Sequence, residues 1–320
     1  MNHLPFQNAL DLIRSSESIL LVSHRRPDGD TLGACLGLEH ALQQWNKKTV
    51  LACIDEIPQR FRFLPNIEKY QREFPLKDFQ LIIICDAGAS HMTGFHEKYP
   101  DFLSKGIPIL NIDHHASNDG FGSINLIDST SSSATMIVWK LLKHGNFRLT
   151  KEIGLALLTG IYNDTGGFIH ANTTQETFQI AGELAQAGLS VSSIVRPLFK
   201  ESNLDQLRLW GFILENLSLN EKKVAASVVS NADLKTLDVR GNETGGIIDL
   251  MSTIPDTSFT LLLTEEDGVV KGSLRTQRDD VSVADIAAQF GGGGHRKAAG
   301  FRIQGRLEQQ KIFRIVPSSV

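Results

Sequence analysis

The chain has 320 residues, of which 41% are hydrophobic and 21% are charged, and its formal net charge is −4 at pH 7. This composition is typical of a globular protein, and the length favours two domains with separate cores. The net charge excludes a global attraction for nucleic acid, and no apolar run of about 18 residues is present to form a membrane-spanning helix.

The first half of the chain alternates strand-like apolar runs with helical patterns. A helix is predicted over 31–45, and strands are predicted over 18–23, 49–54, 80–85, 107–112 and 123–127. This alternation indicates parallel strands joined by crossovers, so we predict a doubly wound parallel-sheet α/β domain. In that class of fold, ligands bind beyond the carboxyl ends of the strands.

The middle of the chain reads as helical. The apolar residues of 204–217 recur close to the helical period, and this segment is interpreted as a connecting helix. The other predicted helices cover 134–144, 151–162, 174–187 and 191–199. The predicted organisation is therefore a first domain over 1–190, a helical linker over 191–217 and a second domain over 218–320.

The last hundred residues change character again. Strands are predicted over 224–229 and 259–263, and the turn Asp267-Gly268 leads to a returning strand over 269–274. A helical stretch over 283–290 then meets four consecutive glycines. We predict a smaller, mixed α/β domain.

Imidazole and carboxylate side chains gather where the predicted strands of the first domain end. A pair of divalent cations requires such a set, and the lack of thiolates in it argues against a structural zinc site. The residues are His24, Asp28 and Asp30 after the first strand, Asp86 after the third, Asp113, His114 and His115 after the fourth, and Asp164 after the helix over 151–162.

Each of these clusters also has a plainer interpretation. Asp30 could cap the helix that follows it, Asp86 could be a cap or a loop residue, and Asp164 could end a helix. Adjacent residues on an extended strand point to opposite faces. If the strand continues through His114 and His115, one of them should therefore ligate and the other should act on the substrate.

The glycine run of the second domain is a candidate anion site. Glycines can form a concave nest of backbone N–H groups, and the neighbouring basic side chains add donors. An arginine at a strand end could grip a phosphate through two hydrogen bonds. A flexible linker and an exposed arginine are the plainer alternatives. The candidate substrate-binding residues are Arg275, Gly292, Gly293, Gly294, His295 and Arg296.

The motifs, taken in order, resemble those of the DHH phosphoesterase superfamily. They are His-x3-Asp-x-Asp from His24, the strand-end Asp86, the Asp-His-His of 113–115 and the Asp-Thr-Gly-Gly of 164–167. The segment 291–301 is similar to the glycine-rich signature of the DHH-associated C-terminal domain. Where that superfamily often has an acidic residue and an arginine shortly after the bridging Asp, this chain has 89-Ala-Ser-His-Met-92.

The resemblance implies a role for each residue of the first domain. Asp86 would bridge two ions, Asp113 would orient His114, and His115 would approach the phosphate and assist catalysis. The first ion would be held by His24, Asp28 and Asp86, and the second by Asp30, Asp86, His114 and Asp164. The implied cofactor is two Mn²⁺ ions, with Mg²⁺ as the alternative, and the implied reaction is hydrolysis of a phosphate ester or anhydride.

Within the superfamily, the length and two-domain plan are similar to the nano-RNase and 3′-phosphoadenosine 5′-phosphate phosphatase group. The implied substrates are short single-stranded oligonucleotides, including dinucleotides, and small phosphorylated nucleotides, with no membrane partner. A phosphodiesterase for cyclic or linear dinucleotides is the alternative, and an inactive nucleotide-binding regulator is the alternative of another class. Three scattered cysteines and the lack of a secretory signal pattern predict a cytoplasmic protein, and a homodimer is left open.

Overall fold

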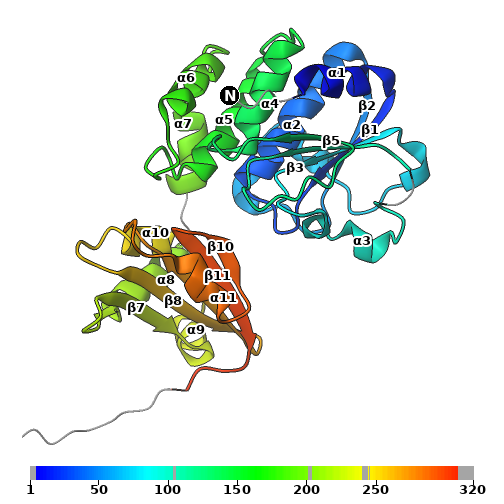
Figure 1. The fold of residues 1–320 in the computed structure, drawn as a ribbon. Coiled ribbons are helices and arrows are strands. Elements are labelled where there is room, and N and C mark those ends of the chain that lie inside the picture. The colour runs from blue at the N-terminus through cyan, green and yellow to red at the C-terminus, as the bar shows by residue number, and fades with distance from the viewer. Residues whose placement is uncertain (1–4, 104–105, 201–203, 240–243, 245, 309–320) are drawn as a thin grey trace, which may run out of the picture. The chain divides into compact units, whose positions relative to one another are not determined.

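A computed structural model describes residues 5–103, 106–200, 204–239, 244 and 246–308, and the chain divides into two units, Met1–Lys200 and Glu201–Val320 (Figure 1). Each unit contains one sheet with its own helices. Among the described residues, no helix has both the length and the apolar character that crossing a membrane requires.

The sheet of the first unit has five parallel strands in the order β2-β1-β3-β4-β5. The strands are β1 (Ser18–Ser23), β2 (Lys48–Ala52), β3 (Leu81–Cys85), β4 (Ile109–Asp113) and β5 (Ile124–Ile127). The apolar runs of the three central strands, β1, β3 and β4, are buried on both faces, as expected for a parallel sheet covered from two sides. The predicted parallel-sheet α/β fold is confirmed.

Two separate cores cover the two faces of this sheet. Ile19 and Leu21 of β1 pack with the side of the sheet that carries α1, α2, α4 and α5, whereas Leu20 and Val22 pack with an aromatic cluster on the side of α3 (Figure 1). The helices are α1 (Phe6–Ser15), α2 (Gly29–Leu42), α3 (Phe95–Lys98), α4 (Ala134–His144), α5 (Lys151–Asp164), α6 (Gln175–Ala185) and α7 (Ser192–Val195), which a π-helical turn (Arg196–Lys200) follows.

Helices α2 and α5 approach each other through glycines. Gly29, Gly33 and Gly37 are spaced by four residues and therefore share one face of α2. A Cβ atom added to Gly33 would lie 2.4 Å from the carbonyl oxygen of Ala156, and one added to Gly29 would lie 2.7 Å from the Cβ of Asn163. These contacts run antiparallel, so the first turn of α2 lies beside the last turn of α5.

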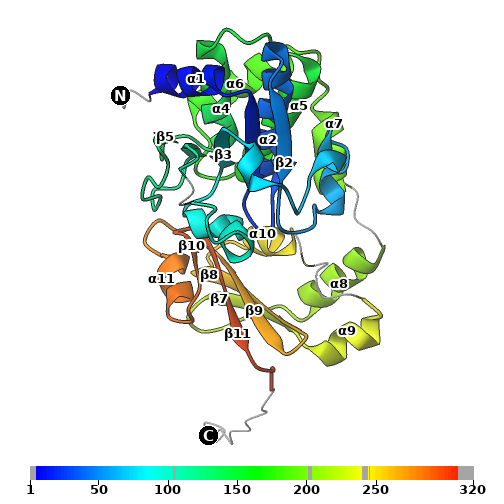
Figure 2. The ribbon, with the colours of Figure 1, turned by 90° about the vertical axis from the view of Figure 1, so that its right-hand side faces the viewer.

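The second unit contains a six-stranded sheet in the order β10-β11-β9-β8-β7-β6 (Figure 2). The strands are β6 (Ser218–Leu219), β7 (Val224–Val229), β8 (Phe259–Glu266), β9 (Val269–Arg275), β10 (Gly293–His295) and β11 (Ala298–Gln304). Only β7 and β8 pair in parallel. The helices are α8 (Leu204–Glu215), α9 (Asn231–Leu237), α10 (Ile247–Met251) and α11 (Val283–Ala288). The predicted mixed α/β class is confirmed.

The segment 191–217, expected as a linker, is divided between the two units. Ile194 of α7 is fully buried in the core of the first unit. Leu209 and Ile213 of α8 are fully buried in the core of the second unit, where they pack with Val229 of β7. The helical period of α8 therefore reflects a face that is packed within the second unit.

Candidate metal centre

The first group of predicted ligands lies between β1 and β3, where the strand order of the sheet reverses. His24 directly follows β1, Asp28 caps the N-terminus of α2, and Asp86 directly follows β3. His24 Nε2 lies 3.8 Å from Asp28 Oδ1 and 3.5 Å from Asp86 Oδ2. Their ligand atoms all fall within 4.8 Å of one another, which is close enough to surround one ion.

The second group surrounds His114, which follows β4. His114 Nε2 lies 3.2 Å from Asp164 Oδ2 and 3.9 Å from Asp30 Oδ2. The same nitrogen lies 3.4 Å from Oδ1 of Asp86, whose other carboxylate oxygen faces His24. The structure thus brings all six predicted metal ligands together, with Asp86 between the two groups.

The burial and the hydrogen bonds of Asp86 indicate whether a cation fits this site. Asp86 is 2% exposed, and its φ of +59° lies in the left-handed region, which is unfavourable for a residue with a Cβ atom. Its amide donates to the carbonyl oxygen of Ile112 over 2.8 Å. Within the described part of the chain, its Oδ1 is buried with no hydrogen-bond partner. Because a buried carboxylate oxygen without a partner is costly, this arrangement fits a bound cation.

Asp30 is held by a segment that the sequence patterns did not single out. Asp28, and not Asp30, caps α2, because its Oδ1 accepts from the amides of Asp30 and Thr31 over 2.9 and 3.2 Å. The fully buried Asp30 carboxylate instead accepts from the amides of Ala134 and Thr135 over 2.5 and 3.0 Å, at the start of α4. A sequence signal existed in the Ser-Ser-Ser-Ala-Thr run of 131–135, which is typical of a helix N-terminus.

The predicted role of Asp113 is corrected by the structure. Asp113 was expected to orient His114, but its Oδ1 lies 2.7 Å from Nδ1 of His115 and contacts His114 only through the backbone amide, over 2.8 Å. The ring of His114 instead places Nδ1 3.3 Å from the carbonyl oxygen of Ser131. Asn118, which the sequence also did not single out, donates to Asp113 Oδ2 over 2.6 Å.

The two histidines do not point to opposite faces, because β4 ends at Asp113 and the alternation stops there. His114 Nε2 and His115 Nδ1 lie 3.4 and 3.6 Å from Asp86 Oδ1. Asp86, His114 and His115 therefore form a third group with metal-ligand spacing. The hydrogen bond to Asp113 occupies Nδ1 of His115, which sets that ring apart from the ring of His114.

The imidazole and carboxylate groups of the centre shift one another's pKa values. Burial would lower the pKa of His114, but the Asp164 and Asp86 carboxylates raise it to about 12. Burial raises the pKa of Asp164 to about 6 against the opposing effect of His114. Burial would also raise the pKa of Asp86, but His114 and His24 lower it well below the ordinary value. The imidazoles thus carry the positive charge that a cation would replace.

The arginine predicted to bind a phosphate is the last residue of β9. Arg275 Nε donates to Asp249 Oδ1 over 2.8 Å, and its Nη1 donates to the carbonyl oxygen of Leu274 over 3.0 Å. Its side chain is 29% exposed. The guanidinium is therefore held by α10, and the N–H groups that these two hydrogen bonds do not use lie on Nη1 and Nη2.

The glycine run does not form the predicted nest of four amides. Gly291 (φ +71°) and Gly292 donate to the carbonyl oxygens of Ala288 and Ala287, both over 3.0 Å, and so end helix α11. Gly293 and Gly294 lie in β10, which pairs with β11. The run serves as a helix stop and an edge strand because only glycine tolerates both requirements here.

The basic residues after the glycines lie near one loop. Arg296 donates from Nη2 to the carbonyl oxygen of Asp279 over 2.8 Å, and Lys297 Nζ lies 2.6 Å from Oδ1 of the same residue. His295 ends β10 and is exposed.

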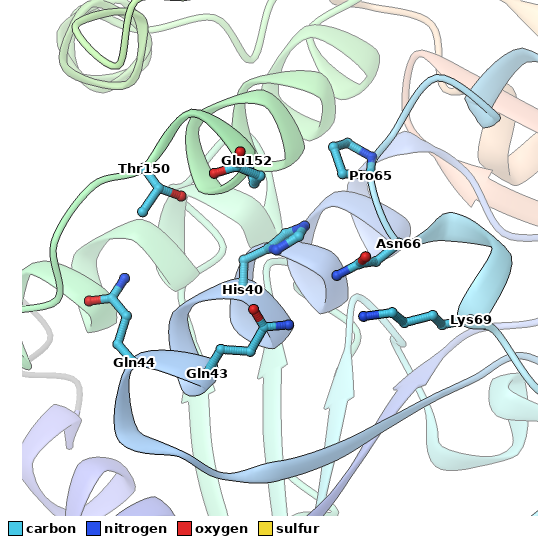
Figure 3. Close-up of a pocket in the computed structure, with 8 residues that line it drawn as sticks. All are labelled: His40, Gln43, Gln44, Pro65, Asn66, Lys69, Thr150 and Glu152. Carbon is cyan, nitrogen blue, oxygen red and sulfur yellow. The ribbon is translucent and has the colours of Figure 1, made fainter.

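A pocket of about 550 Å³ lies apart from the metal centre (Figure 3). His40 and Gln43 come from the C-terminal end of α2, and Thr150 and Glu152 come from the start of α5. The predicted ligands Asp30 and Asp164 occupy the opposite ends of these two helices. The complete lining is His40, Gln43, Gln44, Pro65, Asn66, Lys69, Thr150 and Glu152.

Comparisons with known proteins agree with this picture. The model described as "DHH family, N-terminal domain" matches residues 18–161, and the model described as "DHHA1 domain" matches residues 221–316. The "bifunctional oligoribonuclease and PAP phosphatase NrnA" of Bacillus subtilis is 26% identical over 300 residues, which cover 93% of each chain. The protein of that name from Thermus thermophilus is 29% identical over 307 residues, which cover 93% of this chain and 88% of the relative.

A solved structure shares the fold. The crystal structure of an exopolyphosphatase-related protein from Bacteroides fragilis superposes with a TM-score of 0.88 at 24% identity, over 94% of this chain and 92% of that chain. The secondary structure and topology described above are therefore found in a second protein.

Proposed function

We propose that this phosphoesterase of the DHH family hydrolyses very short oligonucleotides and 3′-phosphoadenosine 5′-phosphate. Two relatives named for both activities align with more than nine-tenths of the chain. The observation that carries the proposal is the buried Asp86 carboxylate, which lies between two groups of metal-ligand spacing.

The residues present fit two divalent cations. His24 and Asp28 would hold one ion, Asp30, His114 and Asp164 would hold the other, and Asp86 would contact both. When bound, the pair supplies positive charge beside the attacked phosphoryl group and lowers the pKa of water. Carboxylates with imidazoles suit Mn²⁺, and Mg²⁺ is the alternative.

His115 is the residue proposed to act on the phosphate. Because a carboxylate only accepts, the contact with Asp113 places the Nδ1 proton of His115 in that hydrogen bond, and the ring acts on a substrate through Nε2. Burial would lower the pKa of His115, but Asp113 and Asp86 raise it above the ordinary value. A protonated ring can stabilise charge on the phosphoryl oxygens or protonate the leaving oxygen.

The second unit is proposed to contribute basic side chains to substrate binding. Its residues 271–306 hold seven lysines and arginines against three aspartates, a local excess that suits a small anionic ligand. Arg275, His295 and Arg296 are the side chains we propose, together with the backbone of Gly292, Gly293 and Gly294. The three buried thiols are unpaired, which is compatible with the proposed cytoplasmic location.

An activity panel tests the proposal. Purified protein with Mn²⁺ or with Mg²⁺ is given a labelled dinucleotide, 3′-phosphoadenosine 5′-phosphate, a cyclic dinucleotide and pyrophosphate, and kcat/KM is compared. We expect the first two to be hydrolysed best, and only with a metal. Preference for the cyclic dinucleotide would favour the alternative phosphodiesterase. Tight binding of nucleotides without turnover of any would favour an inactive regulator and contradict the proposal.

A further inference from the structure

A stacked aromatic pair, formed by the partly buried Phe168 and the exposed Phe178, lies in the segment that follows Asp164. The rings of Phe168 and Phe178 are stacked, with centroids 5.4 Å apart and an interplanar angle of 25°. The ring of Tyr162 meets Phe168 edge-on, with centroids 5.6 Å apart. Phe178 is 59% exposed and the neighbouring Ile169 is 76% exposed. A core role does not explain these two side chains, because most of their surface remains in contact with solvent.

The backbone fixes Phe168 in an unfavourable conformation. Gly166, Gly167 and Phe168 have φ values of +57°, +74° and +71°. The left-handed region is strained for a bulky aromatic residue, so the surrounding contacts must hold it there. The amide of Gly167 donates to the carbonyl oxygen of Tyr162 over 2.8 Å, and the amide of Ile169 donates to that of Thr165 over 3.0 Å. The Phe168 ring therefore has a defined position.

This turn is fastened to the metal centre. His170 Nδ1 and Asn172 Nδ2 lie 3.1 and 3.2 Å from the carbonyl oxygen of Asp164. The carboxylate of Asp164 lies 3.2 Å from His114. Four peptide steps separate Asp164 from Phe168, so their Cα atoms are at most about 15 Å apart, and the turn shortens that span. The backbone of Phe168 is thus held within about 15 Å of a predicted metal ligand.

We propose that Phe178 and Phe168, flanked by Ile169, stack a nucleobase next to the phosphate that is cleaved. This inference rests on the proposed function, and it describes how the protein would hold one end of the substrate beside the metal centre. A flat apolar surface beside a cation site matches a ligand that joins an aromatic ring to a phosphate. Every base has a π face, so the contact selects nucleotides without selecting a particular base.

Substitution of Phe178 tests the proposal, because this residue is exposed on α6 and its removal leaves the core intact. Phe178→Ala should raise KM for a dinucleotide about tenfold, the size expected for loss of one base stack, with kcat unchanged. Phe178→Trp should keep or lower KM. With a dinucleotide that is abasic at the stacked position, Phe178→Ala should have the same KM as the wild type.

The control is Leu103→Ala, which removes another exposed apolar side chain of the same unit, 41% exposed, and should leave KM unchanged. An equal KM for wild type and Phe178→Ala with the intact dinucleotide would overturn the proposal. The proposal would also be overturned if Phe178→Ala raised KM and size-exclusion chromatography showed that the variant had dissociated from an oligomer. The aromatic pair would then be part of a protein interface.

Calorimetric titration with a non-hydrolysable dinucleotide separates this inference from the proposed function. If the wild type binds it but cleaves no dinucleotide, the proposed function fails, while a roughly tenfold weaker Kd for Phe178→Ala still supports the base stack. If the wild type cleaves dinucleotides and both proteins bind with equal Kd, the proposed function stands and the base stack fails.

Discussion

The Asp113 carboxylate and the His115 imidazole form a hydrogen bond in which Oδ1 and Nδ1 are 2.7 Å apart. Asp113 is fully buried, and its second oxygen accepts from Asn118 over 2.6 Å. The ring of His115 is thereby fixed in orientation, whereas the ring of His114 contacts the carbonyl oxygen of Ser131. The two adjacent histidines thus have different supports, and substitutions can separate their roles.

Asp113→Asn is expected to lower kcat for a dinucleotide by about 10–100-fold, the range seen when the support of a site residue is lost. The Kd for Mn²⁺ should stay near that of the wild type, because Asp113 accepts from the backbone amide of His114, whereas the His114 ring contacts the carbonyl oxygen of Ser131. Steady-state kinetics and calorimetric titration of the metal-depleted protein measure the two quantities. A weaker Kd with an unchanged kcat at saturating metal would show that Asp113 supports a metal ligand instead.

Asp86→Ala is expected to abolish hydrolysis, with a loss of at least about a thousandfold in kcat, because both ion positions lose a ligand. Metal analysis of the dialysed protein should show that both ions bind more weakly. Asp11→Asn, on the exposed side of α1, is the control and should behave as the wild type. Near-normal rates for Asp86→Ala would disprove the proposal that Asp86 contacts both ions.

Gly33→Ala is expected to destabilise the first unit by about 1–3 kcal/mol, because the added Cβ would lie 2.4 Å from the carbonyl oxygen of Ala156. To relieve this contact, α2 and α5 must move apart. Because the ends of these helices carry Asp30 and Asp164, metal affinity should fall as well. Thermal unfolding and metal titration measure both effects.

Gly182→Ala is the matched control for Gly33→Ala. Gly182 lies in α6, and a Cβ there meets no atom within 4 Å. Alanine should therefore raise stability by about 0.5–1 kcal/mol without changing metal affinity. Equal effects of the two substitutions would contradict the close-packing account of α2 and α5.

Metal binding should release protons and strengthen as pH rises. The pKa of His114 is raised to about 12, and Asp28 and Asp86 raise the pKa of His24 although burial opposes this. The His114 ring is therefore protonated in the metal-free protein at neutral pH, the raised pKa of His24 favours the same state, and a cation requires both rings neutral. Titrations in two buffers with different ionisation enthalpies should show net proton release at pH 7. A binding enthalpy independent of the buffer would contradict this linkage.

The same raised pKa sets how the metal-free protein responds to pH. Because the folded pKa of His114 lies above its unfolded value of about 6.5, its stabilising effect is complete below pH 6.5 and is lost as pH rises toward 12. The melting temperature of the metal-free protein should therefore fall between pH 7 and pH 10 by more than that of the metal-loaded protein. An identical decline in both would show that His114 is not the titrating group.

Arg275→Ala should raise KM for a dinucleotide more than it lowers kcat, if its role is uniform binding of the substrate. The salt bridge with Asp249 adds a check, because Asp249→Ala frees the guanidinium but leaves its charge in place. That second variant should have a KM closer to the wild type than Arg275→Ala. An unchanged KM for Arg275→Ala would remove this residue from substrate binding.

The fold and the gathering of the candidate ligands could be predicted from the sequence for a local reason. Short apolar runs such as 81–85 favour buried strands, and parallel strands bring the polar residues at their carboxyl ends to one edge of the sheet. His24, Asp86 and His114 could therefore be placed together without coordinates. The boundary of the second unit was harder to place, because the periodicity of α8 shows that one face is buried but not which core buries it.

The hydrogen-bond partners of individual side chains could not be predicted from the sequence. Asp30 accepts from the amides of Ala134 and Thr135, which lie more than a hundred residues later in the chain. Periodicity carries no information on such pairs. Asp113 lies next to His114 and two residues from His115, so spacing alone could not assign its side-chain bond. The glycine run was ambiguous because a helix stop, an edge strand and an anion nest can all contain glycine.

The link between Asp30 and the start of α4 has a consequence for how the centre is assembled. Because the amides of Ala134 and Thr135 hold this carboxylate, part of its ordering comes from the folding of the chain. That part of the entropy of immobilising the ligand is then already lost before a cation arrives. The entropy cost of binding a cation is therefore smaller for Asp30 than for a carboxylate that the protein leaves free to rotate.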